Sequence, residues 1–192
     1  MFRKLYDKTM DLSAKRSAKW VLAGVSFLES SVFPIPPDLF LIPLCLAERS
    51  RSLVYAAYCT VFSVLGGLLG YAIGALFYET LGTQILDFYG YREAFETFAA
   101  NYAEWGFWIV FGAGLTPFPY KVITIASGVV WMNLPMFIVG SILSRGIRFF
   151  AVGALIYFFG ERIRYTLEKY FNWVLSAFFI LLLGGFIAIL YL

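Results

Sequence analysis

The sequence predicts an all-α integral membrane protein. The predicted fold has two inverted re-entrant helical hairpins, each followed by a transmembrane helix. It also has a C-terminal transmembrane helix and interfacial amphipathic helices. Three observations favour this fold class. Of the 192 residues, 61% are apolar and only 14% are charged, whereas about a quarter of the residues of a soluble domain are charged. Three apolar stretches exceed the roughly 20 residues that a helix needs to cross a bilayer. Two further apolar stretches are each interrupted by prolines.

The N-terminal residues 1–19 form a charged arm. Apolar side chains interrupt its charges at roughly helical spacing, which is typical of an amphipathic helix lying at a membrane surface. They are Phe2, Leu5, Tyr6, Met10 and Leu12. A solvated tail is the alternative. The arm is too long for the n-region of a signal peptide, and no small-residue cleavage site follows the apolar run after it.

Proline clusters break two segments of the membrane domain that we predict over residues 20–160. Proline removes a backbone donor and blocks helix continuation. Because lipid cannot satisfy the freed carbonyls, a break at membrane depth is buried in protein or lines a water-filled cavity. We therefore expect re-entrant hairpins whose tips meet in one central region; one long kinked helix over the first segment is the alternative. The hairpins are 20–47, broken at Pro34, Pro36 and Pro37, and 106–132, broken at Pro117 and Pro119.

Full-length spans follow the hairpins, at 53–78 and 134–159, and a third is predicted at 170–192. On the first span, small residues recur every four positions, a pattern that lets another backbone approach closely and predicts helix packing. They are Gly66, Gly70 and Gly74. The connector between the halves is amphipathic over 85–102, which predicts a second interfacial helix.

The placement of basic residues predicts the orientation. The segments 1–19, 48–52 and 160–169 hold eleven of the fifteen basic residues, whereas the connector 79–104 holds one, Arg92, beside five acids. Because cytoplasmic loops carry an excess of Lys and Arg, the N-terminus is predicted to be cytoplasmic and the connector external. The two halves are then inverted copies, and paired broken segments in corresponding halves indicate a transport site.

Five ionisable side chains fall at membrane depth, namely Glu29, Asp38, Lys121, Arg145 and Arg148. Each costs at least roughly 2.5–3.5 kcal/mol at a helix centre, so each is a functional-site candidate, with mutual pairing as the alternative. Two acids against three bases leave one positive charge if all five are ionised. That surplus suits an anionic ligand, phosphate above all, because a guanidinium binds phosphate bidentately. We assign the three bases to phosphate binding and the two acids to proton coupling or gating.

The chain contains no histidine, which removes the commonest general base and metal ligand. The two cysteines, Cys45 and Cys59, both lie in apolar segments and suggest no disulfide framework. We therefore expect no metal, no other cofactor and no nucleic-acid partner. An integral membrane enzyme such as a lipid phosphatase is the least supported class, so we expect a protein that is not an enzyme.

Four segments in order carry a resemblance to a known family. They are Glu29–Asp38 (ESSVFPIPPD), Gly66–Tyr71 (GGLLGY), Thr116–Gly128 (TPFPYKVITIASG) and Ser144–Phe149 (SRGIRF). Together they resemble the DedA family, the bacterial branch of the VTT (SNARE-associated) superfamily, and its YqaA-like subgroup above all. The resemblance runs from about Trp20 to Phe159. It implies facing re-entrant hairpins in a bacterial cytoplasmic membrane and movement of undecaprenyl phosphate or phospholipid between leaflets, often dependent on the proton-motive force. The characteristic membrane acids of the family correspond to Glu29 and Asp38.

The leading hypothesis is therefore a flippase or scramblase with a groove where the hairpins meet. The lipid phosphate would be held by Lys121, Arg145 and Arg148. The partners would be membrane lipids and, where transport is coupled, protons. Two alternatives stay open. One is a proton-coupled transporter of a small ion or drug, and the other is a membrane assembly factor that transports nothing.

Overall fold

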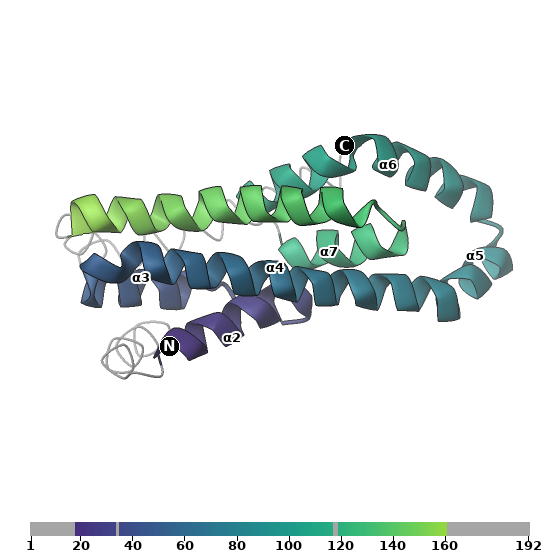
Figure 1. The fold of residues 1–192 in the computed structure, drawn as a ribbon. Coiled ribbons are helices and arrows are strands. Elements are labelled where there is room, and N and C mark those ends of the chain that lie inside the picture. The colour runs from purple at the N-terminus through teal and green to yellow at the C-terminus, as the bar shows by residue number, and fades with distance from the viewer. Residues whose placement is uncertain (1–17, 34, 117–118, 161–192) are drawn as a thin grey trace, which may run out of the picture.

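The computed structural model describes residues 18–33, 35–116 and 119–160, and these residues contain helices and no strand (Figure 1). The predicted N-terminal arm, apart from its last two residues, and the predicted span 170–192 lie outside the described residues.

Most of the helices lie along the length of an elongated molecule (Figure 1). In order they are α2 (Ala18–Ser31), α3 (Asp38–Ala47), the 3-10 turn Arg49–Arg51, α4 (Ser52–Phe77), the π-helical turn Tyr78–Gly82, α5 (Thr83–Tyr89), α6 (Arg92–Leu115), α7 (Tyr120–Val129) and the helix Leu134–Gly160. Helices α2, α3 and α7 all contact α4. Figure 1 shows the chain turning back between α2 and α3, while α5 and the start of α6 form an elbow at the far end of α4.

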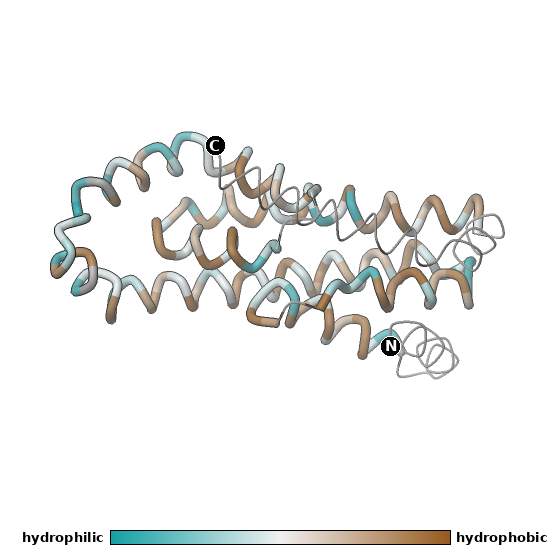
Figure 2. The backbone as a smooth tube through the Cα atoms, turned by 180° about the vertical axis from the view of Figure 1, so that it is seen from behind, coloured by the Kyte–Doolittle hydropathy of each residue, from teal (hydrophilic) through white to brown (hydrophobic). Residues whose placement is uncertain are grey.

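Two helices are long and apolar enough to cross a membrane. They are the continuous helical stretch Arg49–Gly82, with 34 residues, and the helix Leu134–Gly160, with 27. They cover the spans predicted at 53–78 and 134–159. Helix α4 contains no charged residue, and Figure 2 shows hydrophobic residues along both long helices. Large apolar side chains on both are exposed; examples are Val61, Leu65 and Leu69 on α4 and Val139, Ile147 and Leu155 on the other helix.

Each proline cluster separates two helices. Helix α2 ends at Ser31 and α3 begins at Asp38, while α6 ends at Leu115 and α7 begins at Tyr120. Residues 20–47 are therefore two helices and not one long kinked helix.

The connector differs from the interfacial helix predicted over 85–102. Gly90 adopts a positive φ of 69°, the left-handed conformation that commonly ends a helix, so α5 stops at Tyr89. Helix α6 then continues without interruption from Arg92 to Leu115. Gly106, where the sequence analysis begins the second hairpin, lies inside α6, because an isolated glycine is tolerated in a helix.

The glycine stripe of α4 brings both hairpins against this helix. A Cβ atom at Gly66 would overlap the carbonyl of Phe27 on α2, and one at Gly74 would overlap the carbonyl of Ile125 on α7. At Gly70 a Cβ would lie 3.2 Å from the Ser30 carbonyl oxygen. Because glycine has no Cβ, the backbones of α2 and α7 approach α4 more closely than any other residue would permit.

Candidate functional site

Arg145 lies at the centre of a buried polar network. Its guanidinium forms an ion pair with Glu29 and donates from Nε to Ser63 Oγ (2.7 Å) and from Nη2 to Ser30 Oγ (3.2 Å). The rings of Tyr120 and Phe149 lie beside it, with their centroids 4.4 and 5.2 Å from Cζ. Only 1% of the Arg145 side chain is exposed. The predicted phosphate ligand Arg145 is thus enclosed by protein groups from both halves of the chain.

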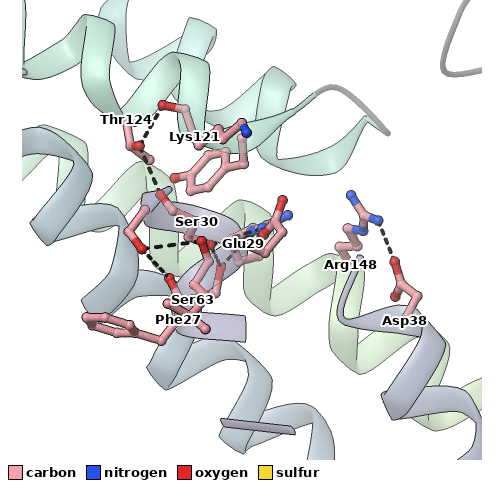
Figure 3. A network of polar contacts seen from close by, with 12 residues as sticks. Phe27, Glu29, Ser30, Asp38, Ser63, Lys121, Thr124 and Arg148 are labelled. Atoms are coloured by element: carbon pink, nitrogen blue, oxygen red, sulfur yellow. Dashed lines mark hydrogen bonds and ion pairs between the residues drawn. The ribbon is translucent and has the colours of Figure 1, made fainter. Parts of the chain in front are cut away.

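Small hydroxyl groups complete this network, and the sequence analysis did not single them out. The Ser30 hydroxyl donates to Glu29 (3.1 Å), and the hydroxyl oxygens of Ser30 and Ser63 lie 2.6 Å apart (Figure 3). Tyr120 donates to Ser141 at 2.6 Å. Buried charges persist in proteins when they are paired and hydrogen-bonded in this way. The pair of Glu29 and Arg145 therefore joins α2 to the helix Leu134–Gly160.

The second ion pair is more open. Arg148 Nη2 donates to Asp38 Oδ2 at 2.6 Å, and the two side chains are 17% and 18% exposed (Figure 3). Arg148 Nη1 donates to the carbonyl of Thr116 at 3.0 Å. Asp38 is the first residue of α3, and Thr116 follows α6. A single guanidinium thus connects the end of the first proline break to the start of the second.

Asp38 uses only one of its two carboxylate oxygens in this pair. Oδ1 is buried and has no hydrogen-bond partner among the residues that the structure describes. Buried polar atoms without a partner are rare in native structures.

Lys121 lies in the first turn of α7, directly after the second proline break. We call the region that contains Asp38, Thr116, Lys121 and Arg148 the junction. Its Nζ donates to the carbonyl of Val32 at 3.2 Å. The side chain is half-buried, and within the described ranges 18–33, 35–116 and 119–160 no carboxylate forms an ion pair with it. Among the described residues it is the third cation of the site, after Arg145 and Arg148, and it is the one without an ion pair.

The second hairpin provides donors for backbone carbonyls at the first proline break. The carbonyls of Ser30 and Val32 lie four residues before Pro34 and Pro36, which have no N–H group to complete a helical hydrogen bond. Thr124 Oγ1 donates to the Ser30 carbonyl at 3.0 Å, and Lys121 donates to that of Val32. Both donors lie on α7. The end of the first helix before the break therefore lies against the start of α7.

The five predicted charges thus divide unequally. Both acids lie on the first hairpin and all three bases in the second half. Aligning the two proline motifs places Asp38 opposite Lys121, and both begin the helix after a break, yet the ion pair of Asp38 is with Arg148. Arg148 and Lys121 are partly exposed at the junction, whereas Arg145 is sealed beneath it. Within the described part of the chain there is no cluster of three or more His, Cys, Asp or Glu side chains suited to a metal ion.

Comparison with known proteins gives two relatives and no functional description. No family model matches the chain, and no solved structure matches it. An "Uncharacterized protein" of Haemophilus influenzae is 39% identical over 170 residues, which cover 88% of each chain. An "Uncharacterized protein HI0703 homolog" of Histophilus somni is 36% identical over 169 residues, again 88% of each. With this identity over most of both lengths, the chain belongs to the same family as these Haemophilus influenzae and Histophilus somni proteins.

Proposed function

We propose that the protein is a membrane lipid transporter, a flippase or scramblase, which moves a phosphate-bearing lipid between leaflets where the two proline breaks meet. The observation that carries the proposal is the partly exposed cluster of Asp38, Arg148 and Lys121 at this junction. Arg148 belongs to one of the two helices that are long and apolar enough to cross a membrane, and α3 and α7, which carry Asp38 and Lys121, both contact the other.

The outward faces of the long helices support a membrane location. Contiguous exposed apolar surface on this scale contacts lipid or a partner, and α4 carries no charge along its length. The resemblance to the DedA family and the distribution of basic residues favour the bacterial cytoplasmic membrane with the N-terminus in the cytoplasm. In this orientation the first hairpin is re-entrant from the cytoplasm and the second from outside.

The accessible charges suit a phosphate group. The Arg148 guanidinium is a planar fork that matches phosphate oxygens, and the Lys121 ammonium is a compact charge with three donors, of which the structure uses one. Lys121 also lies in the first turn of α7, where the helix dipole is positive and favours an anion. The headgroup would pass this cluster while the acyl chains remain in the surrounding lipid.

Arg145 takes a different role in this proposal from the one that the sequence analysis assigns to it. Its Nε and Nη2 donors are engaged by Glu29, Ser30 and Ser63, and its side chain is sealed. We therefore assign phosphate binding to Arg148 and Lys121, and we assign Arg145 with Glu29 to holding the first hairpin against the helix Leu134–Gly160. Asp38, which competes for Arg148, becomes the gating acid.

Lipid movement in vesicles tests the proposal. The full chain is reconstituted with labelled phospholipid and, separately, labelled polyprenyl phosphate, and the fraction of label reaching the opposite leaflet is followed over time. We expect faster movement than in protein-free vesicles, and loss of that movement in Arg148→Ala at equal protein density. Arg92→Ala, which removes an arginine from the exposed connector, serves as the matched control and retains activity. Movement of both lipids at the protein-free rate contradicts the proposal.

One observation favours a second candidate, an assembly factor that transports nothing. Four of the five membrane charges are already paired across the two halves, as a purely structural bridge requires. The exchanged variant Asp38→Arg with Arg148→Asp separates the two functions. It restores a structural bridge with the opposite polarity but carries the arginine to the wrong side of the junction for headgroup binding. Full biological activity in the exchanged variant, without lipid movement in vesicles, favours the assembly factor.

A further inference from the structure

We propose that the junction selects phosphodiester lipids whose headgroup carries its own hydrogen-bond donor, a hydroxyl or a primary ammonium, and that Asp38 is the specificity-determining residue. This inference rests on the proposed function and names the substrate class of the same site.

The hydrogen bonding of Asp38 is incomplete. Its Oδ2 accepts from Arg148, while its buried Oδ1 has no partner among the described residues. An ionised carboxylate accepts several hydrogen bonds, and a buried acceptor left without one is destabilising. The site therefore has an unused acceptor directly beside its phosphate-binding arginine.

Phosphate binding would change the partners of Arg148. Arg148 is bound to Asp38 through one nitrogen and to the Thr116 carbonyl through another, so it cannot also present its full fork to a phosphate. Binding requires Arg148 to turn from the carboxylate to the ligand. Asp38 then loses its cation, and both of its oxygens need donors.

No other described cation is free to replace Arg148 beside Asp38. Arg145 is held by Glu29, Ser30 and Ser63 in a sealed site. Lys121 donates to the first break at Val32 and faces the phosphate in the proposed complex. The remaining source of a donor is the headgroup itself. Arg148 and Asp38 thus give up their contact with each other and bind the two ends of one headgroup. Arg148 binds the phosphate, and Asp38 accepts from the hydroxyl or ammonium.

Charge balance favours a diester over a monoester. Asp38, Arg148 and Lys121 together carry a net charge of +1. A phosphodiester carries one negative charge, so a diester with a hydroxylated headgroup neutralises the cluster. In a diester with an ammonium, the ammonium pairs with Asp38 and the phosphate faces the two bases. A phosphomonoester carries about −1.5 to −2 at neutral pH, which places excess negative charge beside Asp38 and provides no cation to pair with it.

Headgroups that differ only in their donors give the sharpest test. Ethanolamine and choline lipids share the same phosphodiester, but the trimethylated nitrogen of choline has no N–H. The full chain is reconstituted with lipids labelled on an acyl chain, bearing ethanolamine, glycerol or choline headgroups, and with labelled polyprenyl phosphate. We expect the ethanolamine and glycerol lipids to move roughly tenfold faster than the choline lipid, in line with the loss of one hydrogen bond to a charged group. Polyprenyl phosphate should move more slowly than the ethanolamine and glycerol lipids.

The variant Asp38→Asn checks the assigned residue. The amide has nearly the same shape but no charge, so we expect the ratio of ethanolamine to choline rates to fall toward one, with folded yield followed by size-exclusion chromatography. Equal rates for ethanolamine and choline in the unmodified protein overturn the inference and leave the proposed function intact. If polyprenyl phosphate moves fastest of the four lipids, the inference is also overturned and the proposed function is left intact. Absence of movement for all four lipids overturns the proposed function and this inference with it.

Discussion

The hydroxyl of Thr124 on α7 donates to the backbone carbonyl of Ser30 on α2 across 3.0 Å. Ser30 lies four residues before a proline, so one half of the fold provides the donor that the sequence of the other half removes. Gly70 makes room for this contact on α4, because a Cβ at that position would meet both residues. The first hairpin therefore depends on the second for a backbone hydrogen bond.

Replacing Thr124 by valine tests this dependence. Valine preserves the shape of the side chain and removes the donor, which leaves the buried Ser30 carbonyl without a partner. We expect the free energy of unfolding in detergent to fall by about 1–3 kcal/mol. Thr97, an exposed threonine of α6 that bonds only within its own helix, gives the control Thr97→Val, for which we expect little change. Equal effects of the two substitutions would show that the contact between α7 and α2 contributes nothing.

A methyl group on the glycine stripe should separate the hairpins from α4. In Gly74→Ala the new Cβ overlaps the carbonyl of Ile125, and overpacking of this kind costs roughly 1–3 kcal/mol. Gly24→Ala is the matched control, because nothing lies within 4 Å of its Cβ position and alanine favours the helix by up to about 1 kcal/mol. Unfolding in mixed detergent measures both. An unchanged stability of Gly74→Ala contradicts the close approach of α7 to α4.

The two arginines of the helix Leu134–Gly160 should fail in different ways. Arg145→Ala leaves Glu29 buried and unpaired, at a cost of about 3–5 kcal/mol, so we expect little folded protein. The double variant Arg145→Ala with Glu29→Gln should recover much of the yield. Arg148→Ala removes the partner of a side chain that is 18% exposed, so we expect it to fold and to lose lipid movement.

Folded yield by size-exclusion chromatography and lipid movement in vesicles, measured on the same preparations, separate these outcomes. Well-folded Arg145→Ala that moves no lipid would instead return Arg145 to the phosphate-binding group.

The predicted orientation can be tested with single cysteines. The native cysteines, Cys45 and Cys59, are buried and should give low background labelling. Ser50, in the turn before α4, and Glu93, at the start of α6, are both exposed. We expect a membrane-impermeant maleimide added to intact cells to label Glu93→Cys and not Ser50→Cys, and to label both after permeabilisation. Labelling of both positions in intact cells contradicts the orientation.

The sequence predicted best those elements that depend on local chemistry. Uncharged apolar runs predicted the two long helices within a few residues, since few other patterns produce 20 or more apolar positions in a row. The prolines predicted where α2 and α6 end, because the loss of an N–H group acts on the preceding turn. Gly106 shows the limit of this reasoning, since a lone glycine permits a break without requiring one, and α6 passes through it.

The contacts within the site were less predictable. Arg145 and Arg148 lie three residues apart on one helix, and the sequence gives no reason to treat them differently. Their burial differs because Tyr120, from another helix, and Phe149 cover only Arg145. Ser30 and Ser63 carry no distinctive spacing, and their role depends on a contact between α2 and α4. The pairing of Asp38 with Arg148 spans 110 residues of sequence, and no local pattern predicts a contact over that separation.

The separation of acids and bases between the two halves has a consequence for biosynthesis. The ion pairs join residues 116 and 110 positions apart, and in each pair the acid is made first. At a translation rate of about 5–20 residues per second, the first hairpin leaves the ribosome roughly 5–20 s before its arginines. In the proposed membrane setting, Glu29 and Asp38 spend this interval without their cations. A chain that stops short of Arg145 would keep both acids unpaired, so the contacts of the first hairpin can be completed only after most of the chain has been made.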